Sequence, residues 1–184
     1  MVIATPAATA QSAHVHGRGQ VDIAIENDRV YLALASPGAD IVGFEHAPRN
    51  AKQKAAVAAA LGKFGNPAEL LRFTPAADCR VIRASAELEI DDEHEKHSAD
   101  EDGHGQHEHE AYRQDDNHGG KENHGALVAE YEFACSQIDA LAEIEFTYFA
   151  RFGNAQALEI VLIDGRGQRR EDIGRADPVL RLAQ

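Results

Sequence analysis

One tract in the middle of the chain most constrains what this protein can fold into. Residues 91–125 contain seven of the ten histidines together with twelve acidic and three basic side chains, a net charge of −9, and almost no apolar residues. Such a composition cannot bury enough apolar surface to offset the entropy lost on ordering the chain. We therefore expect residues 91–125 to form a disordered loop. The other 149 residues of the 184-residue chain carry only −4 of the total charge of −13.

The segments that flank this tract alternate apolar and polar side chains. The alternation covers residues 82–90 before the tract and residues 127–135 after it. A period of two is typical of half-buried strands, because successive side chains of a strand point to opposite faces. We expect two long strands joined by the His-rich loop.

The rest of the sequence predicts more strands and a few helices. Alternation on both sides of Asn27-Asp28 indicates a hairpin, and the alanine-rich residues 50–63 predict a helix. A short helix is expected at 67–71, and strands are expected near 144–146, 158–163 and up to 173. These elements indicate one α+β domain with a mostly antiparallel sheet, a few helices and the long loop between two strands.

Two cysteines, Cys79 and Cys135, lie on either side of the tract. A disulfide between them and a pair of reduced thiols are both compatible with two cysteines alone. Placing the cysteines opposite each other pairs Val81 with Phe133 but sets Ile82 against a glutamate. Because a one-residue slip turns every side chain to the other face, either a β-bulge intervenes or the disulfide crosses from a strand end.

The His-rich tract offers the ligands of a metal-binding segment. Neutral imidazole is a good ligand for zinc and its neighbours in the first transition row, and carboxylates add to the ligand set. Short spacings between histidines lower the entropy cost of recruiting a second ligand. The negative charge attracts divalent cations, and imidazole stays neutral above a pH of about 6.5. The candidate ligands in the tract are His94, His97, His104, His107, His109, His118 and His124.

Three further histidines lie outside the tract. His14 and His16 form a His-x-His pair that suits an auxiliary metal site, although such a pair near a chain end is equally often incidental. His46 lies in a turn before the predicted helix, where a histidine more often makes a structural hydrogen bond than binds a metal. We carry all three forward as candidate metal ligands.

We do not expect a catalytic metal site. The run His94-Glu95-Lys96-His97 is one residue short of H-E-x-x-H, and no G-x-S-x-G occurs. Catalytic zinc needs three fixed ligands and a shaped, dry cavity, which a long hydrophilic loop does not supply. The sequence therefore predicts a protein without enzymatic activity and without catalytic residues.

The charge balance argues against two classes of partner. The 31 acidic side chains against 18 basic ones disfavour both nucleic acid and an anionic membrane surface. No stretch approaches the roughly 18 apolar residues of a membrane span, so we expect no membrane insertion. Residues 1–13 are small and uncharged like the end of a secretory signal. We interpret them as a leader remnant or flexible N-terminus before a domain at 14–184.

Five features of the sequence together are typical of one protein family. They are the His/Asp/Glu-rich insertion and the runs Ala13–Gly17, Gly43–Pro48, Ala77–Cys79 and Ala129–Cys135. With these motifs the chain resembles the ZrgA-like family of zinc-regulated periplasmic zinc-binding proteins. The resemblance implies an exported protein that binds Zn²⁺ and assists zinc import through an ABC-type uptake system. It also implies functional roles for His16 and His46 and a disulfide between Cys79 and Cys135.

Three hypotheses follow from the sequence. The first is a periplasmic protein that captures Zn²⁺ through residues 91–125 and passes it to the periplasmic component of an ABC importer. The second is a periplasmic buffer or storage protein for zinc, nickel, cobalt or copper, which differs in the direction of metal flux and not in the ligands. The third is a secreted metal-dependent hydrolase, which the lack of a complete catalytic motif disfavours.

Overall fold

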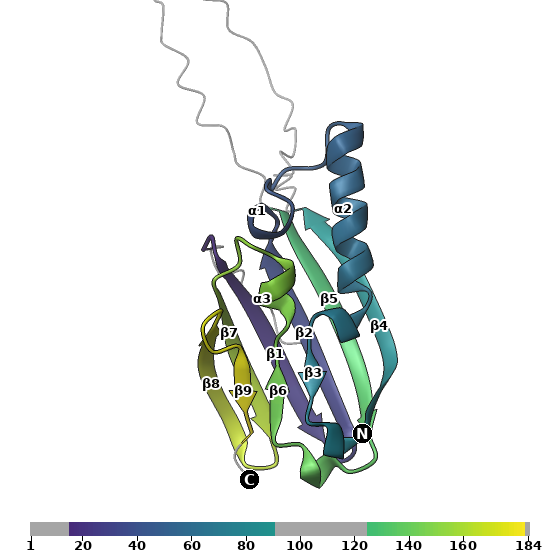
Figure 1. Ribbon diagram of the computed structural model, residues 1–184, viewed down its shortest axis with the longest axis vertical. Coiled ribbons are helices and arrows are strands. Elements are labelled where there is room, and N and C mark those ends of the chain that lie inside the picture. The colour runs from purple at the N-terminus through teal and green to yellow at the C-terminus, as the bar shows by residue number, and fades with distance from the viewer. Residues whose placement is uncertain (1–14, 91–124, 183–184) are drawn as a thin grey trace, which may run out of the picture.

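The computed structural model describes residues 15–90 and 125–182 (Figure 1). The strands and helices in these ranges are β1 (Arg18–Glu26), β2 (Arg29–Pro37), α1 (Gly38–Ile41), α2 (Ala51–Phe64), β3 (Arg72–Phe73), β4 (Cys79–Ile90), β5 (Gly125–Cys135), β6 (Glu143–Glu145), α3 (Tyr148–Arg151), β7 (Ala157–Asp164), β8 (Gly167–Gly174) and β9 (Val179–Arg181). Short 3-10 turns occupy Pro67–Glu69, Pro75–Ala77 and Ile138–Ala140. No helix in the described ranges is long and apolar enough to span a membrane.

Six of the described strands form one large sheet in the order β4-β5-β2-β1-β7-β8. The predicted hairpin is confirmed, because β1 and β2 pair antiparallel around a turn in which Asn27 adopts a positive φ of 54°. Four of the five pairings are antiparallel, and β1 pairs with β7 in parallel. The predicted mostly antiparallel α+β fold is therefore confirmed.

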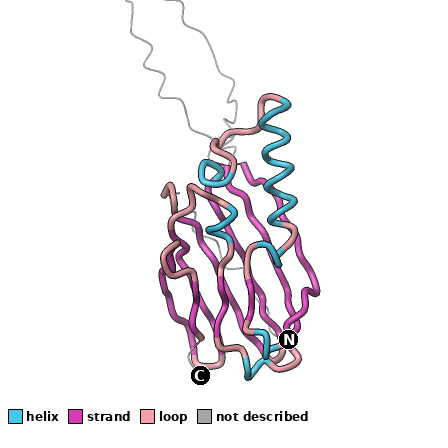
Figure 2. Tube along the Cα trace, in the orientation of Figure 1, coloured by secondary structure: helices cyan, strands magenta, loops and turns pink. Residues whose placement is uncertain are grey.

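The large sheet buries one of its faces. Side chains that alternate along β1, β2 and β7 are almost fully buried on that face, as expected from the period of two; they include Val21, Ile23, Leu32, Leu34, Leu158, Ile160 and Leu162. Helices α2 and α3 and the small sheet cover the same face, as Figures 1 and 2 show. The opposite face carries the alternate side chains, which are partly charged, as at Asp22 and Glu130, and partly apolar, as at Tyr31 and Ile163.

Helix α2 lies over β4 and β5 near one end of the sheet (Figure 1). The side chain of Asn50 caps the helix, because its Oδ1 accepts a hydrogen bond of 2.9 Å from the backbone N–H of Gln53. Val57 and Phe64 are buried on the side that faces the core. The prediction of a helix over 50–63 is confirmed, whereas the expected short helix at 67–71 is a single 3-10 turn.

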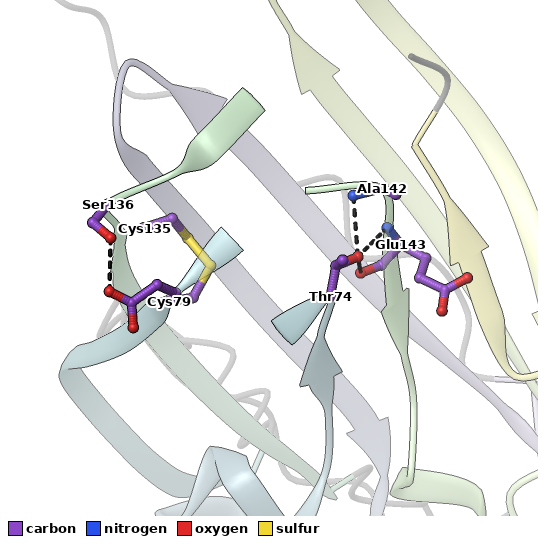
Figure 3. Close-up of a disulfide and its surroundings, with 7 residues drawn as sticks. Thr74, Cys79, Cys135, Ser136, Ala142 and Glu143 are labelled. Atoms are coloured by element: carbon purple, nitrogen blue, oxygen red, sulfur yellow. Dashed lines mark hydrogen bonds between the residues drawn. A yellow bond between two sulfur atoms is a disulfide. The ribbon is translucent and has the colours of Figure 1, made fainter. Parts of the chain in front are cut away.

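The strands that flank the His-rich tract pair with each other, as predicted. Cys79 lies directly opposite Cys135, and their sulfur atoms form a disulfide of 2.02 Å (Figure 3). The register shifts between Val81 and Arg83, so a β-bulge absorbs the extra residue. Of the two alternatives that the sequence left open, the β-bulge is therefore correct. After the bulge, Ala84, Ala86 and Leu88 lie opposite apolar residues of β5 on the core face.

A second sheet of three short strands, in the order β3-β6-β9, covers the buried face. Thr74 helps to fasten β3 to β6, because its Oγ1 accepts hydrogen bonds from the backbone N–H groups of Ala142 and Glu143 at 3.1 and 2.9 Å (Figure 3). The sequence predicts β6 but neither β3 nor β9. Strands of two or three residues are too short for alternation to be visible.

Candidate functional site

The His-rich tract is joined to one end of the β4–β5 pair. Ile90, the last residue of β4, lies opposite Gly125, the first residue of β5. The chain between them therefore leaves and re-enters the fold at adjacent positions. The disulfide lies at the other end of the same ladder. The geometry thus places the two attachment points of the tract together, far along β4 and β5 from the covalent bond.

Most of the predicted ligands lie outside the described residues. Of the ten histidines, the structure places only His16 and His46. The other candidates lie at positions 14 and 91–124, for which no structure is described; they are His14, His94, His97, His104, His107, His109, His118 and His124. Their roles as metal ligands stay predictions.

The loop that contains His46 packs against the start of β5. A Cβ added to Gly125 would lie 2.5 Å from the carbonyl oxygen of Glu45, and one added to Gly38 would lie 2.5 Å from that of Phe44. Real Cβ atoms do not approach backbone oxygens so closely, so both positions require glycine. This close packing fixes residues 44–46 beside the point where the tract re-enters the fold.

His16 lies at the same end of the fold, in the turn before β1. Its Nδ1 is 3.6 Å from Oε1 of Glu45, and its side chain is 71% exposed whereas that of Glu45 is 15% exposed. A mostly buried carboxylate therefore faces a solvent-accessible imidazole. His, Glu and Asp are common ligands of zinc, so this pair supplies two donor groups of suitable chemistry.

Asp40 holds the backbone beside His16. Its two carboxylate oxygens accept hydrogen bonds of 2.9 and 2.7 Å from the N–H of Gly17, which has a positive φ of 82°. Burial raises the pKa of the Asp40 carboxyl above its ordinary 3.8, and the charge of Glu45 acts in the same direction. The bond from Gly17 and the proximity of His16 partly oppose this rise. A second carboxylate thus contributes negative charge next to His16.

The ring of His46 is oriented by two contacts. Its Nδ1 lies 2.8 Å from the carbonyl oxygen of Ala47, and the ring stacks on Phe44 with a centroid separation of 5.1 Å. Because a carbonyl oxygen only accepts, Nδ1 must donate its proton in this bond. In the neutral ring, Nε2 then keeps its lone pair, which is the arrangement that metal-binding histidines use.

The described residues do not by themselves form a complete metal site. Within residues 15–90 and 125–182, no three His, Cys, Asp or Glu side chains come close enough together to hold a metal ion. The sequence did not single out Asp40 or Glu45. An acidic residue within the otherwise apolar and small residues 33–44 is the signal that could have identified Asp40, and Glu45 directly precedes the candidate His46.

Comparison with known proteins identifies the family of the chain. No curated protein matches it closely. A family model described as "ZrgA family zinc uptake protein" matches residues 13–182, which is nearly the whole chain. The expected resemblance is therefore confirmed, and the match includes all ten histidines, the two cysteines and the His-rich tract. This chain belongs to the ZrgA family of zinc uptake proteins.

Proposed function

We propose that this protein captures Zn²⁺ in the periplasm through residues 91–125 and passes it to the periplasmic component of an ABC-type importer. The observation that carries the proposal is the density of ligands in the tract, with seven histidines and twelve carboxylates in 35 residues. Membership of a zinc uptake family supports zinc as the cargo. The disulfide supports an oxidising compartment, because such bonds are rare in the cytosol.

The tract binds zinc by imidazole ligation in a field of negative charge. Spacings such as His94-x-x-His97 and His107-x-His109 let one ion recruit two ligands at small cost in chain entropy. A ligand set drawn from a long hydrophilic segment gives adaptable sites, and their affinity is lower than that of a rigid site because binding must order the chain. A donor protein needs that property, since zinc must move on to a tighter acceptor.

His16 and His46 act as auxiliary ligands on the folded body. Both belong to the end of the fold where the tract begins and ends, and Glu45 and Asp40 add negative charge there. In this proposal the carboxylate of Glu45 lies behind the His16 imidazole and favours a bound cation. A long hydrophilic segment does not supply the shaped, dry cavity that catalytic zinc needs. We therefore propose that the tract binds zinc and does not catalyse a reaction.

A calorimetric zinc titration tests the role of the tract. In the first variant, the dipeptide Asn-Gly replaces residues 91–124, because Ile90 and Gly125 are directly paired and a two-residue turn fits between paired strand ends. We expect a folded protein that has lost most of the bound zinc. In a second variant, the seven histidines of the tract are replaced by asparagine and the carboxylates are kept, which separates the contribution of imidazole from that of length and charge. We expect this variant to lose most of the bound zinc as well. Unchanged stoichiometry in either variant would refute the proposal.

A transfer experiment tests the direction of flux. The zinc-loaded protein is mixed with the metal-free periplasmic component of a zinc importer, and the metal content of each is measured after separation. We expect zinc to move to the importer component, faster than by dissociation into a chelator of equal affinity. Retention of the metal, or transfer at the chelator rate, would favour the buffering role.

A further inference from the structure

Among the residues that the structure describes, none pairs with the outer side of strand β4, which is an edge of the large sheet. It is the terminal strand next to β5 and twelve residues long, and most of its side chains are exposed. Val81 and Ile82, at the bulge, are 48% and 54% exposed. An edge of this length presents a row of unpaired backbone groups, which is a template for pairing with another strand. Figure 1 shows β4 at the outer margin of the sheet.

The opposite edge strand, β8, makes contacts with the segment that follows it. The segment after β8 folds back so that Gly174 pairs with Asp177, and the Arg169 guanidinium donates a hydrogen bond of 2.6 Å to the carbonyl oxygen of Arg181. Neither contact has a counterpart along β4 in the part of the chain that the structure describes. Both strands are edges of the sheet, and β4 is the longer of the two, with twelve residues against eight in β8.

The charges of β4 are divided between its two halves. Arg80 and Arg83 lie in the first half, and Glu87 and Glu89 lie in the second. Arg83, Ser85 and Glu87 project from the face opposite the core, as their pairing with Glu132, Glu130 and Val128 of β5 shows. Neither Arg83 nor Glu87 belongs to an ion pair within residues 15–90 and 125–182. This pattern is complementary to itself when one copy is reversed.

We propose that β4 pairs antiparallel with β4 of a second copy of this chain, about a two-fold axis at Ser85. In this register Arg83 of each copy lies opposite Glu87 of the other, so two cross-strand ion pairs form. Ala84 faces Ala86, and the exposed Ile82 faces Leu88. The pairing is isologous, with the same patch on both copies, which is the commonest symmetry of soluble oligomers.

The charges also disfavour other arrangements of the same edge. A parallel, in-register pair would place Arg83 beside Arg83 and Glu87 beside Glu87. Moving the axis to Leu88 would place Glu87 opposite Glu89, and like charges directly opposite are destabilising. The antiparallel register at Ser85 instead places opposite charges side by side and leaves the small residues Ala84 and Ala86 next to the two-fold axis.

Antiparallel pairing also separates the two His-rich tracts. Each tract follows Ile90 at the end of β4, so reversing one copy places the two points of attachment at opposite ends of the joined strands. Each tract carries a net charge of −9. This arrangement keeps the two negative segments apart and leaves both open to zinc. A two-fold axis perpendicular to the sheet places both α2 helices on the same face of the joined sheet.

Sedimentation of the full chain, without zinc and with chelator present, tests the pairing by charge exchange. We expect a dimer of twice the 19.9 kDa chain mass. Arg83→Glu turns two attractive pairs into two repulsive ones and should raise the dissociation constant about tenfold or more. Glu87→Arg should do the same, and the double exchange should restore the dimer. A monomer up to millimolar concentration, or a dimer that ignores these changes, would overturn the proposal.

A cysteine placed on the two-fold axis tests the register. Residues directly opposite in an antiparallel pair have Cα atoms about 4.5–5.5 Å apart, within the range of a disulfide. Oxidised Ser85→Cys protein should therefore run as a covalent dimer on a non-reducing gel. The matched control is Gln168→Cys, on the exposed edge strand β8, which should stay a monomer. Equal cross-linking of both variants, or none at position 85, would refute the register.

Discussion

Removing the disulfide between Cys79 and Cys135 should lower the free energy of unfolding by about 4 kcal/mol. The two residues are 56 positions apart, so the bond closes a loop of 57 residues that contains the whole His-rich tract. In the chain-entropy model this bond stabilises the protein by restricting the unfolded chain, and the loop length alone sets the figure. The measurement is urea unfolding of the parent protein and of the Cys79→Ala, Cys135→Ala double variant.

The same model predicts how this loss depends on the tract. Replacing residues 91–124 with Asn-Gly removes 34 residues, adds two and leaves a loop of 25 residues. The disulfide should then contribute about 0.7 kcal/mol less, because the entropy of closure grows with the logarithm of loop length. The packing lost at Cys135 is the same in both backgrounds, so it cancels in the difference. A loss below about 1 kcal/mol in the full chain, or an equal or larger loss in the shortened one, would refute the entropic reasoning.

Two further predictions concern single residues. Gly125→Ala should destabilise the protein by about 1–3 kcal/mol, because the new methyl group meets the Glu45 carbonyl oxygen. Gly62→Ala, in open space within α2, should instead stabilise it by about 0.5–1 kcal/mol; thermal unfolding of both variants checks the contrast. Ser136→Ala should raise the pKa of Asp78 toward 3.8, because the Ser136 hydroxyl donates a 2.7 Å hydrogen bond that holds this pKa down. The stability that Asp78 contributes is present above pH 3.8 and is lost as the pH falls through its lowered pKa, and carbon NMR of the carboxyl measures the shift.

The strands that the sequence predicts are those whose alternation is long enough to see. β1 and β2 each place several apolar side chains at every second position, and the Asn27-Asp28 turn sets their register. The bulge could be inferred only as one of two alternatives, because the inconsistency at Ile82 shows that the register must shift but not how. The long strands and the pairing of neighbouring strands can therefore be predicted from the local residue pattern, without knowledge of contacts between distant segments.

The order of the strands could not be predicted, because it depends on contacts between distant segments. The parallel pairing of β1 with β7 joins residues more than 130 positions apart, and no local pattern indicates it. The pairing of His16 with Glu45 also joins residues from different elements, at a separation of 29 positions. It depends on the bond from Gly17 to Asp40 and on two glycines that admit the 44–46 loop. Sequence reasoning could name both histidines but not the carboxylates beside them.

The body that carries the tract has an apolar core and a disulfide of its own. Its buried apolar side chains form one cluster between the large sheet and the covering elements, and the disulfide joins β4 to β5 at the end away from the tract. In a protein whose fold depends on zinc, the free energy of zinc binding is part of the free energy of folding, so removal of the ion unfolds the protein. Here the residues of the core cluster and of the disulfide all lie outside the segment that we propose to bind zinc. Capture and release can then occur while the sheet, and the β4 edge through which we propose that two copies pair, stay folded.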